Sequence, residues 1–292
     1  MSIRAAGMLA CVSLPFILAQ VAAAEDSSFS ADGFRYSVHS GERIAAFCER
    51  LQEEGVSSSD IFLRIASTAQ FPGFPFVPAP RQDVNRFEGL FVPGQYTLAL
   101  GFLSADGLSD TQKLWLTKRM IAQLLEASAR RLKGFHSRVG LGLSQSITLA
   151  SIVEKEAVNG KDYGKIASVF CNRLRTNTPL ASCPAVEYFL GYHRPYLQLS
   201  DILTDSPYNL YMHPGLPPTP IAFFTDAAFR SVMDPPDTSY QFFVFDWARG
   251  LHYFATDFVG HQANMEISLE HFKAAYGADQ MFTRHLGKFY EY

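Results

Sequence analysis

The sequence predicts an α+β fold with an antiparallel sheet and packed helices. Apolar residues recur at helical spacing over 109–133, 144–158 and 162–175. The stretch YQFFVFDWARGLHYFAT (240–256) instead has two apolar runs around a turn from Asp246 to Gly250, which is typical of a β-hairpin. Because helices and paired strands occupy separate parts of the chain, we expect α+β architecture.

The composition is that of a globular protein with a sizeable core. The chain has 292 residues, of which 48% are hydrophobic and 18% are charged, so we expect one or two domains. The formal net charge is only −3. A nucleic-acid-binding protein needs a basic face, so we expect no nucleic-acid partner.

Residues 1–24 have the pattern of a targeting segment. Arg4 precedes a mostly apolar stretch from Met8 to Ala22, and three alanines then resemble a cleavage site. Two interpretations stay open, a cleaved signal peptide or an uncleaved anchor, since roughly 20 apolar residues span a bilayer. Both predict export, with the membrane contacted only through this segment.

The sequence pattern of residues 25–82 predicts a small α/β module followed by a proline-rich linker. Phe34 to Val38 alternates like a short strand, and Ser40 is the expected N-cap of the helix that follows. Ser59 opens a second helix, and FPGFPFVPAP (71–80) is typical of a rigid linker. The expected division of the chain is 1–24, 25–82 and 83–292.

Cap residues predict where the next two helices begin. Ser109 and Gln112 have the spacing of a capping box, which starts the longest helix. The helix that follows is expected to begin at Ser144 or Ser146.

Beyond these helices, residues 179–225 are expected to be mostly loop. The four prolines of PGLPPTP (214–220) stiffen this region and suggest the wall of a cleft. A final helix is predicted over 262–276.

The sequence contains none of the common cofactor or metal motifs. It has no P-loop, no HExxH, no CxxC and no Gly-x-Ser-x-Gly elbow, and its eight histidines are scattered. We therefore expect no cofactor and no metal. Three cysteines follow the targeting segment, Cys48, Cys171 and Cys183, so at most one disulfide forms within the chain. Cys171–Cys183 is the nearer pair, but buried free thiols are the favoured interpretation.

The sequence LASIVEKEAV (149–158) places two glutamates at the end of an apolar helix. A helix advances about 100° per residue, so Glu156 lies about 20° from Leu149, whereas Glu154 lies about 160° from Glu156. The two carboxylates therefore cannot act together. Glu156 lies on the apolar face, where burial raises the pKa of a carboxyl group. A carboxyl that donates a proton near neutral pH needs such a raised pKa. The alternative is a structural glutamate that bends to water or pairs with a local cation.

Several spaced motifs resemble the endolytic murein transglycosylase (YceG-like) family between about Phe87 and Met265. The matching segments are EGLFVPGQY (88–96), ASIVEKE (150–156), KIASVFCNRL (165–174), SPYNLY (206–211), GLPPTPI (215–221) and the 240–256 hairpin followed by His261. The second glutamate of ASIVEKE corresponds to the family's catalytic residue. The resemblance implies a YceG-like α+β catalytic domain after a LysM-like module, of which residues 34–67 resemble only the last part.

The resemblance implies lytic cleavage of peptidoglycan between MurNAc and GlcNAc, which leaves a 1,6-anhydro end. Glu156 would serve as the single general acid and base. Glycan strands are the implied substrate, cell-wall synthases are expected partners, and the implied location is the periplasm or cell envelope. The implied substrate-binding residues are Ser182, Tyr208, Asn209, Tyr211, Gly215, Leu216, Pro217, His252, Thr256 and His261.

The chain departs from the family pattern in LASCPAVEY (180–188). Cys183 stands where the family has aspartate, and Ala185 where it has threonine. A catalytically weak or inactive peptidoglycan-binding homologue is therefore the alternative.

Several implied site residues also have structural alternatives. For Tyr208 and Tyr211, the alternative to substrate binding is packing as aromatic residues of the core. For Asn209, it is hydrogen bonding to the nearby backbone. For Pro217, the alternative is a role in shaping the loop. For His252, it is a hydrogen bond that serves the structure only.

Overall fold

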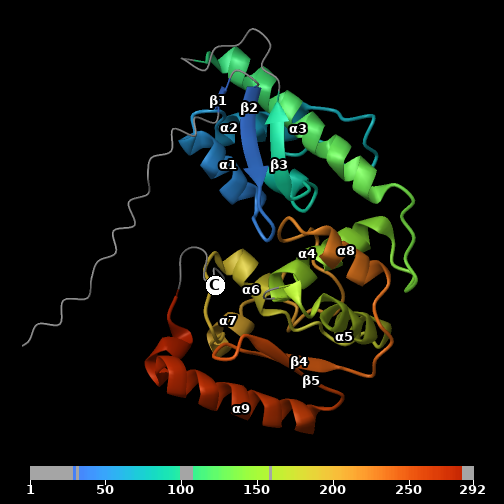
Figure 1. Cartoon of the computed structure of the whole chain (residues 1–292), viewed down its shortest axis with the longest axis vertical. Coiled ribbons are helices and arrows are strands. Elements are labelled where there is room, and N and C mark those ends of the chain that lie inside the picture. The colour runs from blue at the N-terminus through green and yellow to red at the C-terminus, as the bar shows by residue number, and fades with distance from the viewer. Residues whose placement is uncertain (1–28, 31–32, 99–107, 158–159, 285–292) are drawn as a thin grey trace, which may run out of the picture.

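The structure, a computed structural model, describes residues 29–30, 33–98, 108–157 and 160–284. The predicted targeting segment lies outside the described residues. The described chain forms two packing units, one above the other in Figure 1. We call β1–β3 with α1–α3 the N-terminal unit, and α4–α9 with β4 and β5 the C-terminal unit. The α+β prediction is confirmed.

The N-terminal unit packs helices against an antiparallel sheet of order β1-β2-β3. In the longest pairing, Phe34 of β2 lies opposite Leu98 of β3. The elements are β1 (Phe29–Ser30), β2 (Gly33–Val38), α1 (Ile44–Glu53), α2 (Ser59–Thr68), η1 (Val84–Phe87), β3 (Gly94–Leu98) and α3 (Asp110–Leu132).

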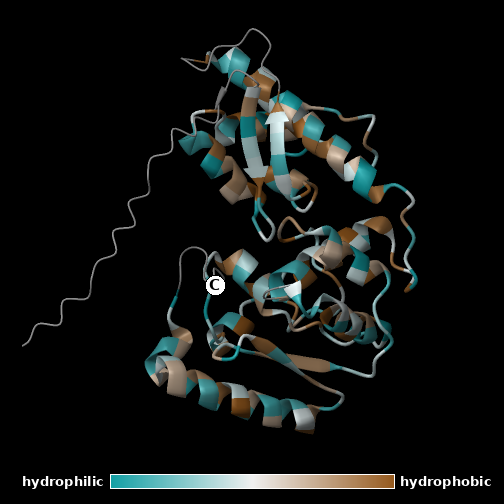
Figure 2. Cartoon of the chain, viewed as in Figure 1, coloured by the Kyte–Doolittle hydropathy of each residue, from teal (hydrophilic) through white to brown (hydrophobic). Residues whose placement is uncertain are grey.

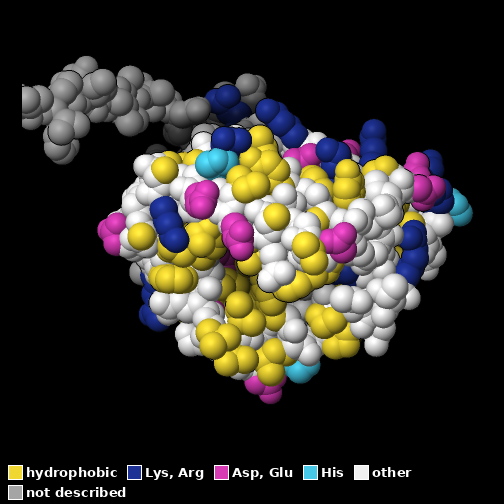
Figure 3. Space-filling model, turned by 90° about the horizontal axis from the view of Figure 1, so that it is seen from below, with side chains coloured by type: hydrophobic (Ala, Val, Ile, Leu, Met, Phe, Trp, Pro, Cys, Tyr) yellow, Lys and Arg dark blue, Asp and Glu magenta, His cyan; other side chains and the backbone are white. Residues whose placement is uncertain are grey.

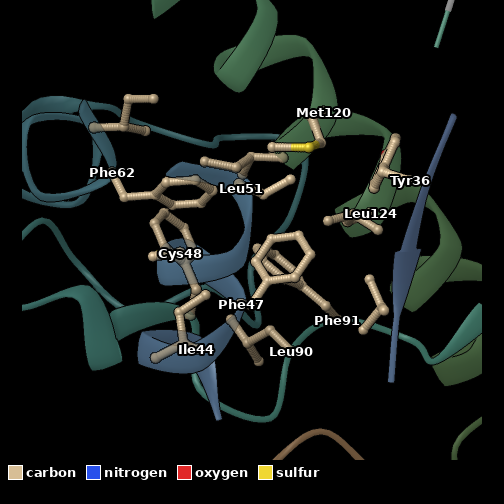
Figure 4. Packing of buried hydrophobic residues seen from close by; sticks show 14 of the residues in the cluster. Tyr36, Ile44, Phe47, Cys48, Leu51, Phe62, Leu90, Phe91, Met120 and Leu124 are labelled. Atoms are coloured by element: carbon tan, nitrogen blue, oxygen red, sulfur yellow. The ribbon is translucent and has the colours of Figure 1, made fainter. Parts of the chain in front are cut away.

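Helix α1 buries one face of apolar residues at helical spacing in a phenylalanine-rich core. Ile44, Phe47, Cys48 and Leu51 are at most 1% exposed and pack together in Figure 4. Ser40 is not the N-cap of this helix, contrary to the prediction, because the helix begins after Arg43, which offers no side-chain cap. The carboxylate of Glu88 accepts the Ile44 backbone N–H at 3.0 Å instead, so a distant residue satisfies the first turn.

The N-terminal core extends across the predicted boundary after residue 82. β3 pairs with β2, and Leu116, Met120 and Leu124 of α3 belong to the same hydrophobic cluster as α1. The division at 82/83 stays a prediction about separate folding units. The predicted Ser109–Gln112 capping box of α3 is confirmed.

The C-terminal unit surrounds helix α4 with helices and a hairpin. The predicted hairpin is confirmed, with Phe243 opposite Phe254; it is mostly hydrophobic in Figure 2, and α9 runs along it. The elements are α4 (Leu143–Glu156), α5 (Tyr163–Arg175), α6 (Cys183–Leu190), α7 (Leu199–Ile202), α8 (Asp226–Met233), β4 (Phe242–Asp246), β5 (Leu251–Ala255), α9 (Phe258–Tyr276) and η3 (Ala278–Phe282). Among the described residues, no helix has the length and hydrophobicity to cross a membrane.

Two helix starts in this unit differ from the prediction. α4 begins after Gly142, whose N–H donates to the Gln145 side chain at 2.9 Å, so neither Ser144 nor Ser146 is the cap. α9 begins four residues earlier than predicted because the Asp257 side chain accepts the Gly260 N–H at 2.8 Å.

The region predicted to be mostly loop, 179–225, contains α6 and α7. These helices have only eight and four residues, too short for a periodic pattern to identify them.

Two of the quoted motifs meet where the units join. Gly89 adopts a left-handed φ of +71°, and a Cβ there would lie 2.4 Å from Pro220 of GLPPTPI. Phe223 inserts its ring into the N-terminal core. Its N–H and C=O form 2.8 Å hydrogen bonds with Glu42 O and Gly41 N. The segment around Phe223 therefore holds the C-terminal unit against the residues just before α1.

Candidate active site

The two glutamates of the LASIVEKEAV stretch lie on different sides of α4, and Glu154 has a structural role. Its carboxylate accepts hydrogen bonds from the Thr225 N–H at 2.9 Å, the Thr225 hydroxyl at 2.8 Å and the Tyr163 hydroxyl at 3.1 Å. Thr225 is the N-cap of α8. Glu154 therefore holds α8 against α4.

Glu156, the last residue of α4, lines a cavity of about 600 Å³ in the C-terminal unit. Residues from α6, β4 and α9 also line this cavity. Among the residues that the resemblance implied, Tyr211 and His261 also line the cavity, as does Cys183. Seen from below, the molecule gathers hydrophobic side chains around a hollow (Figure 3).

Burial raises the pKa of the Glu156 carboxyl to about 8. The nearby carboxylate of Glu187 raises it further, while Ser182 and the Arg173 guanidinium lower it. The Ser182 hydroxyl is buried and has no hydrogen bond of standard geometry, so we regard its opposing effect as weak. Glu156 is therefore mostly protonated at neutral pH and can donate a proton.

Cys183 and Tyr211 form a neutral pair beside Glu156. The Cys183 sulfur lies 3.0 Å from the Tyr211 hydroxyl. Burial raises the pKa of both groups above the ordinary values, and the Glu156 carboxylate raises both further. The three described cysteines are free, which agrees with the favoured interpretation. Since the thiol stays neutral, it adds no charge to the site.

Of the two predicted histidines, only His261 faces the cavity. Its ring stacks on Phe242 at 5.1 Å between centroids, and its Nδ1 is buried without a hydrogen bond to any described residue. Burial lowers the pKa of His261, so it is a neutral polar group available to a ligand. His252 belongs to β5 of the hairpin and does not line the cavity. Its Nδ1 lies 3.2 Å from Asp162 Oδ2, which matches its structural alternative.

Asn209 is fully buried and bonds the backbone of its own loop. Its amide donates to Ile202 O at 2.7 Å and Thr204 O at 2.8 Å, and its oxygen accepts the Tyr211 N–H at 3.0 Å. It therefore positions Tyr211 without lining the cavity. Tyr208 also lies outside the cavity, and its hydroxyl is 2.7 Å from Thr219 Oγ1.

The remaining residues implied by the resemblance do not line this cavity. Gly215 and Leu216 are half-buried, Pro217 is buried and Thr256 is exposed. Their part in substrate binding stays a prediction.

Sequence reasoning missed four charged residues of the site. Lys155, Arg173, Arg194 and Glu266 line the cavity. Glu187, which does not line it, raises the pKa of Glu156. Arg173 lies within the quoted KIASVFCNRL motif, and Lys155 lies between the two glutamates. Arg194 and Glu266 occur in no motif that could have marked them.

The described residues contain no group of three or more His, Cys, Asp or Glu side chains that could hold a metal ion.

Comparison with known proteins gives a consistent family. The model of the YceG-like family matches residues 16–267. The endolytic murein transglycosylase of Bacillus subtilis (strain 168) is 35% identical over 135 residues, 46% of this chain and 37% of that protein. The enzyme of the same name from Streptococcus pneumoniae serotype 2 (strain D39 / NCTC 7466) is 29% identical over 188 residues, 62% of this chain and 32% of that protein. The matched region thus spans about a third of the length of these curated relatives.

A solved structure shares the fold. The crystal structure of a yceG-like protein from Listeria monocytogenes aligns with a TM-score of 0.55 and 24% sequence identity. The alignment covers 78% of this chain and 75% of that chain.

Proposed function

Because the chain belongs to the YceG-like family, we propose that it is a peptidoglycan lytic transglycosylase with Glu156 as its single general acid and base. The observation that supports this role best is the position of Glu156, whose carboxyl opens into the cavity and has a pKa of about 8. A carboxyl with that pKa is protonated at neutral pH and still able to give up its proton.

In the first step, Glu156 donates its proton to the glycosidic oxygen between MurNAc and GlcNAc. The C1–O bond of MurNAc breaks, the GlcNAc end leaves as an alcohol, and positive charge develops on the MurNAc ring. The carboxylate left on Glu156 stabilises that charge.

In the second step, Glu156 acts as the base. It accepts the proton of the MurNAc 6-hydroxyl while that oxygen bonds to C1, which closes the 1,6-anhydro ring. Since the nucleophile belongs to the substrate, one carboxyl that first gives and then regains a proton is sufficient. A hydrolase would instead need a second carboxyl for water or for a glycosyl intermediate.

Neutral polar groups suit the rest of the site to this chemistry. Tyr211, Cys183 and His261 offer hydrogen-bonding atoms to sugar hydroxyls and add no negative charge next to Glu156. The apolar wall of Phe243 and Trp247 offers the flat surfaces on which sugar rings commonly pack.

The proposal also includes the module and location expected from the sequence. The order strand, helix, helix, strand from β2 through α1 and α2 to β3 is consistent with a LysM-like module. The targeting pattern before residue 25 supports a periplasmic or envelope location, with cleavage and inner-membrane tethering both open. Association with cell-wall synthases is part of the same proposal.

The test is digestion of purified peptidoglycan in water enriched in oxygen-18, with mass analysis of the products. A lytic transglycosylase forms 1,6-anhydro ends that contain no oxygen-18. Reducing ends that contain oxygen-18 would show hydrolysis and would overturn the proposal.

The cysteine in the cavity favours a second candidate, a peptidoglycan-binding protein without turnover. Cys183 contacts Tyr211 beside Glu156 at the position where the family pattern has aspartate. If the missing carboxylate limits turnover, Cys183→Asp should create or strengthen the release of 1,6-anhydro products. Glycan binding without product in both proteins would favour this second candidate, and unchanged turnover in the variant would exclude a limiting role for Cys183.

A further inference from the structure

Cations outnumber anions on the cavity wall. Lys155, Arg173 and Arg194 line it, against Glu156 and the exposed Glu266. Glu156 is mostly protonated at neutral pH, so it contributes little negative charge. The backbone of a glycan strand is uncharged, so its sugar rings and hydroxyls do not account for this excess.

Two of the three cations have internal tasks. Arg173 donates from Nε to Gln241 O at 2.6 Å and from Nη1 to Leu180 O at 2.7 Å, which ties β4 to the loop before α6. Lys155 interacts with the carboxylate of Glu187. Arg194 remains as the cation whose donors are least used.

Arg194 is 4% exposed, yet its Nε and Nη1 atoms donate no hydrogen bond to any of the residues that the structure describes. Its closest acidic partner is Asp201, whose Oδ2 lies 3.5 Å from Nη1. That distance makes an ion pair without a well-formed hydrogen bond, and the two Asp201 oxygens already accept from the Tyr192 hydroxyl at 2.7 Å and the Gln198 N–H at 2.9 Å. A buried guanidinium with unused donors is costly unless an ordered water or a ligand satisfies them.

Hydrogen bonds to Glu187 hold the chain segment that carries Arg194. The Arg194 N–H donates to Glu187 Oε1 at 3.1 Å, and His193 Nδ1 lies 3.0 Å from Glu187 Oε2. Glu187, at 2% exposure, thus anchors the segment that carries Arg194, and the same carboxylate acts on Glu156. Glu187 therefore holds the segment of the cation in place and also acts on the proposed acid through its charge.

We propose that Arg194 is a substrate-binding residue that pairs with a carboxylate of the glycan's muramic acid side arm. This inference rests on the proposed function and deepens it. A planar guanidinium matches a carboxylate with two parallel hydrogen bonds. In peptidoglycan the carboxylate comes either from the lactyl group, where the peptide has been removed, or from the attached peptide. Because GlcNAc has no such group, the pairing distinguishes the two sugars and orients MurNAc toward Glu156.

The test measures binding directly, so it does not depend on turnover. Three soluble disaccharides of GlcNAc and MurNAc are titrated by calorimetry into the full chain and its Glu156→Gln form. One has a free lactyl carboxylate, one has that group as an uncharged amide, and one has a peptide attached. We expect the acid to bind about tenfold more tightly than the amide, the gain typical of a charge-assisted hydrogen bond.

Arg194 variants assign the difference. Arg194→Gln should remove the preference for the acid, Arg194→Lys should keep part of it, and Arg249→Gln, an exposed arginine outside the cavity, should leave it unchanged. Thermal unfolding of each variant shows whether it is folded, and Arg194→Lys keeps the test valid if Arg194→Gln is not. Tight, Arg194-dependent binding of the peptide form alone would identify the peptide as the source.

Weak binding of all three would overturn the inference, and so would equal affinity for acid and amide with no Arg194-dependent gain for the peptide form. So would a preference for the acid that survives Arg194→Gln in a folded protein. If the acid is preferred through Arg194 but no 1,6-anhydro ends form, the proposed activity fails while the carboxylate site stands.

Discussion

Each of the two units contains a glutamate whose pKa is raised by burial, and the units use these two residues differently. In the N-terminal unit, Glu88 is 1% exposed and accepts the Ile44 N–H at 3.0 Å and the Tyr188 hydroxyl at 3.3 Å. In the C-terminal unit, Glu156 faces a cavity. Burial raises the pKa of Glu88 to about 7 and that of Glu156 to about 8. A raised pKa alone therefore does not identify a catalytic acid, since the access of a ligand to the carboxyl also has to be present.

The largest effect expected from this comparison is on activity. Glu156→Gln should lower the rate of 1,6-anhydro product formation by about 100-fold or more, because the amide cannot transfer the proton. The rate is measured by mass analysis of released products. Stability should not fall, since the variant removes a carboxyl that is unfavourably buried when charged.

Glu266→Gln is the matched control, because Glu266 lines the same cavity as an exposed carboxyl. It should retain activity within a few-fold of wild type. A large loss in Glu266→Gln would point to a two-carboxylate mechanism and contradict the single-acid proposal.

The second expected effect is on stability. Glu88→Ala should lower the free energy of unfolding by about 3 kcal/mol, because it leaves the Ile44 N–H and the Tyr188 hydroxyl unpaired and opens a cavity. Chemical denaturation measures this loss. Glu88→Gln, which keeps one acceptor oxygen, should lose less. If the folded Glu88 variants lost activity as strongly as Glu156→Gln, the assignment of a structural role would be wrong.

A third expectation concerns pH and separates the two carboxyls. Both folded-state pKa values lie above the ordinary value of 4.5, so the folded chain holds these protons more tightly than the unfolded chain. Their contribution to stability is complete below about pH 4.5. It is lost as pH rises, up to about pH 7 for Glu88 and about pH 8 for Glu156. Glu156→Gln should flatten the fall between pH 7 and 8 and leave the Glu88 part, as followed by thermal unfolding.

The same protonation sets the alkaline limit of activity. Because the acid step needs protonated Glu156, kcat/KM should fall above about pH 8, by about tenfold per pH unit. A profile that stays flat to pH 10 would contradict the assignment of Glu156 as the acid.

The smallest effect is expected at Glu154, which shares helix α4 with Glu156. Glu154→Gln should cost about 1 kcal/mol of stability, because one of its contacts to Thr225 or Tyr163 is lost. Activity should stay within about threefold, as measured in the same product assay. Loss of activity in Glu154→Gln together with full activity in Glu156→Gln would reverse the roles of the two residues.

Local patterns predicted most of the long elements but misplaced the starts of α1, α4 and α9. The capping box of α3, the hairpin and helix α5 depend on neighbouring residues, and they are present as predicted. The predicted start of α1 was wrong because the group that accepts the hydrogen bond of its first turn, Glu88, is distant in the sequence. The short helix α6, which carries Cys183, was missed because eight residues give too little periodicity.

The sequence by itself determined that Glu154 and Glu156 lie on different sides of one helix, because helical geometry is local and repeats every 3.6 residues. Only the tertiary structure decided what each does. Thr225, far along the chain, forms hydrogen bonds with Glu154. Tyr211 and His261, equally distant in sequence, line the cavity that Glu156 faces. Burial, pKa and the unused donors of Arg194 depend on which distant surfaces come together, and no spacing of residues in the chain reports that.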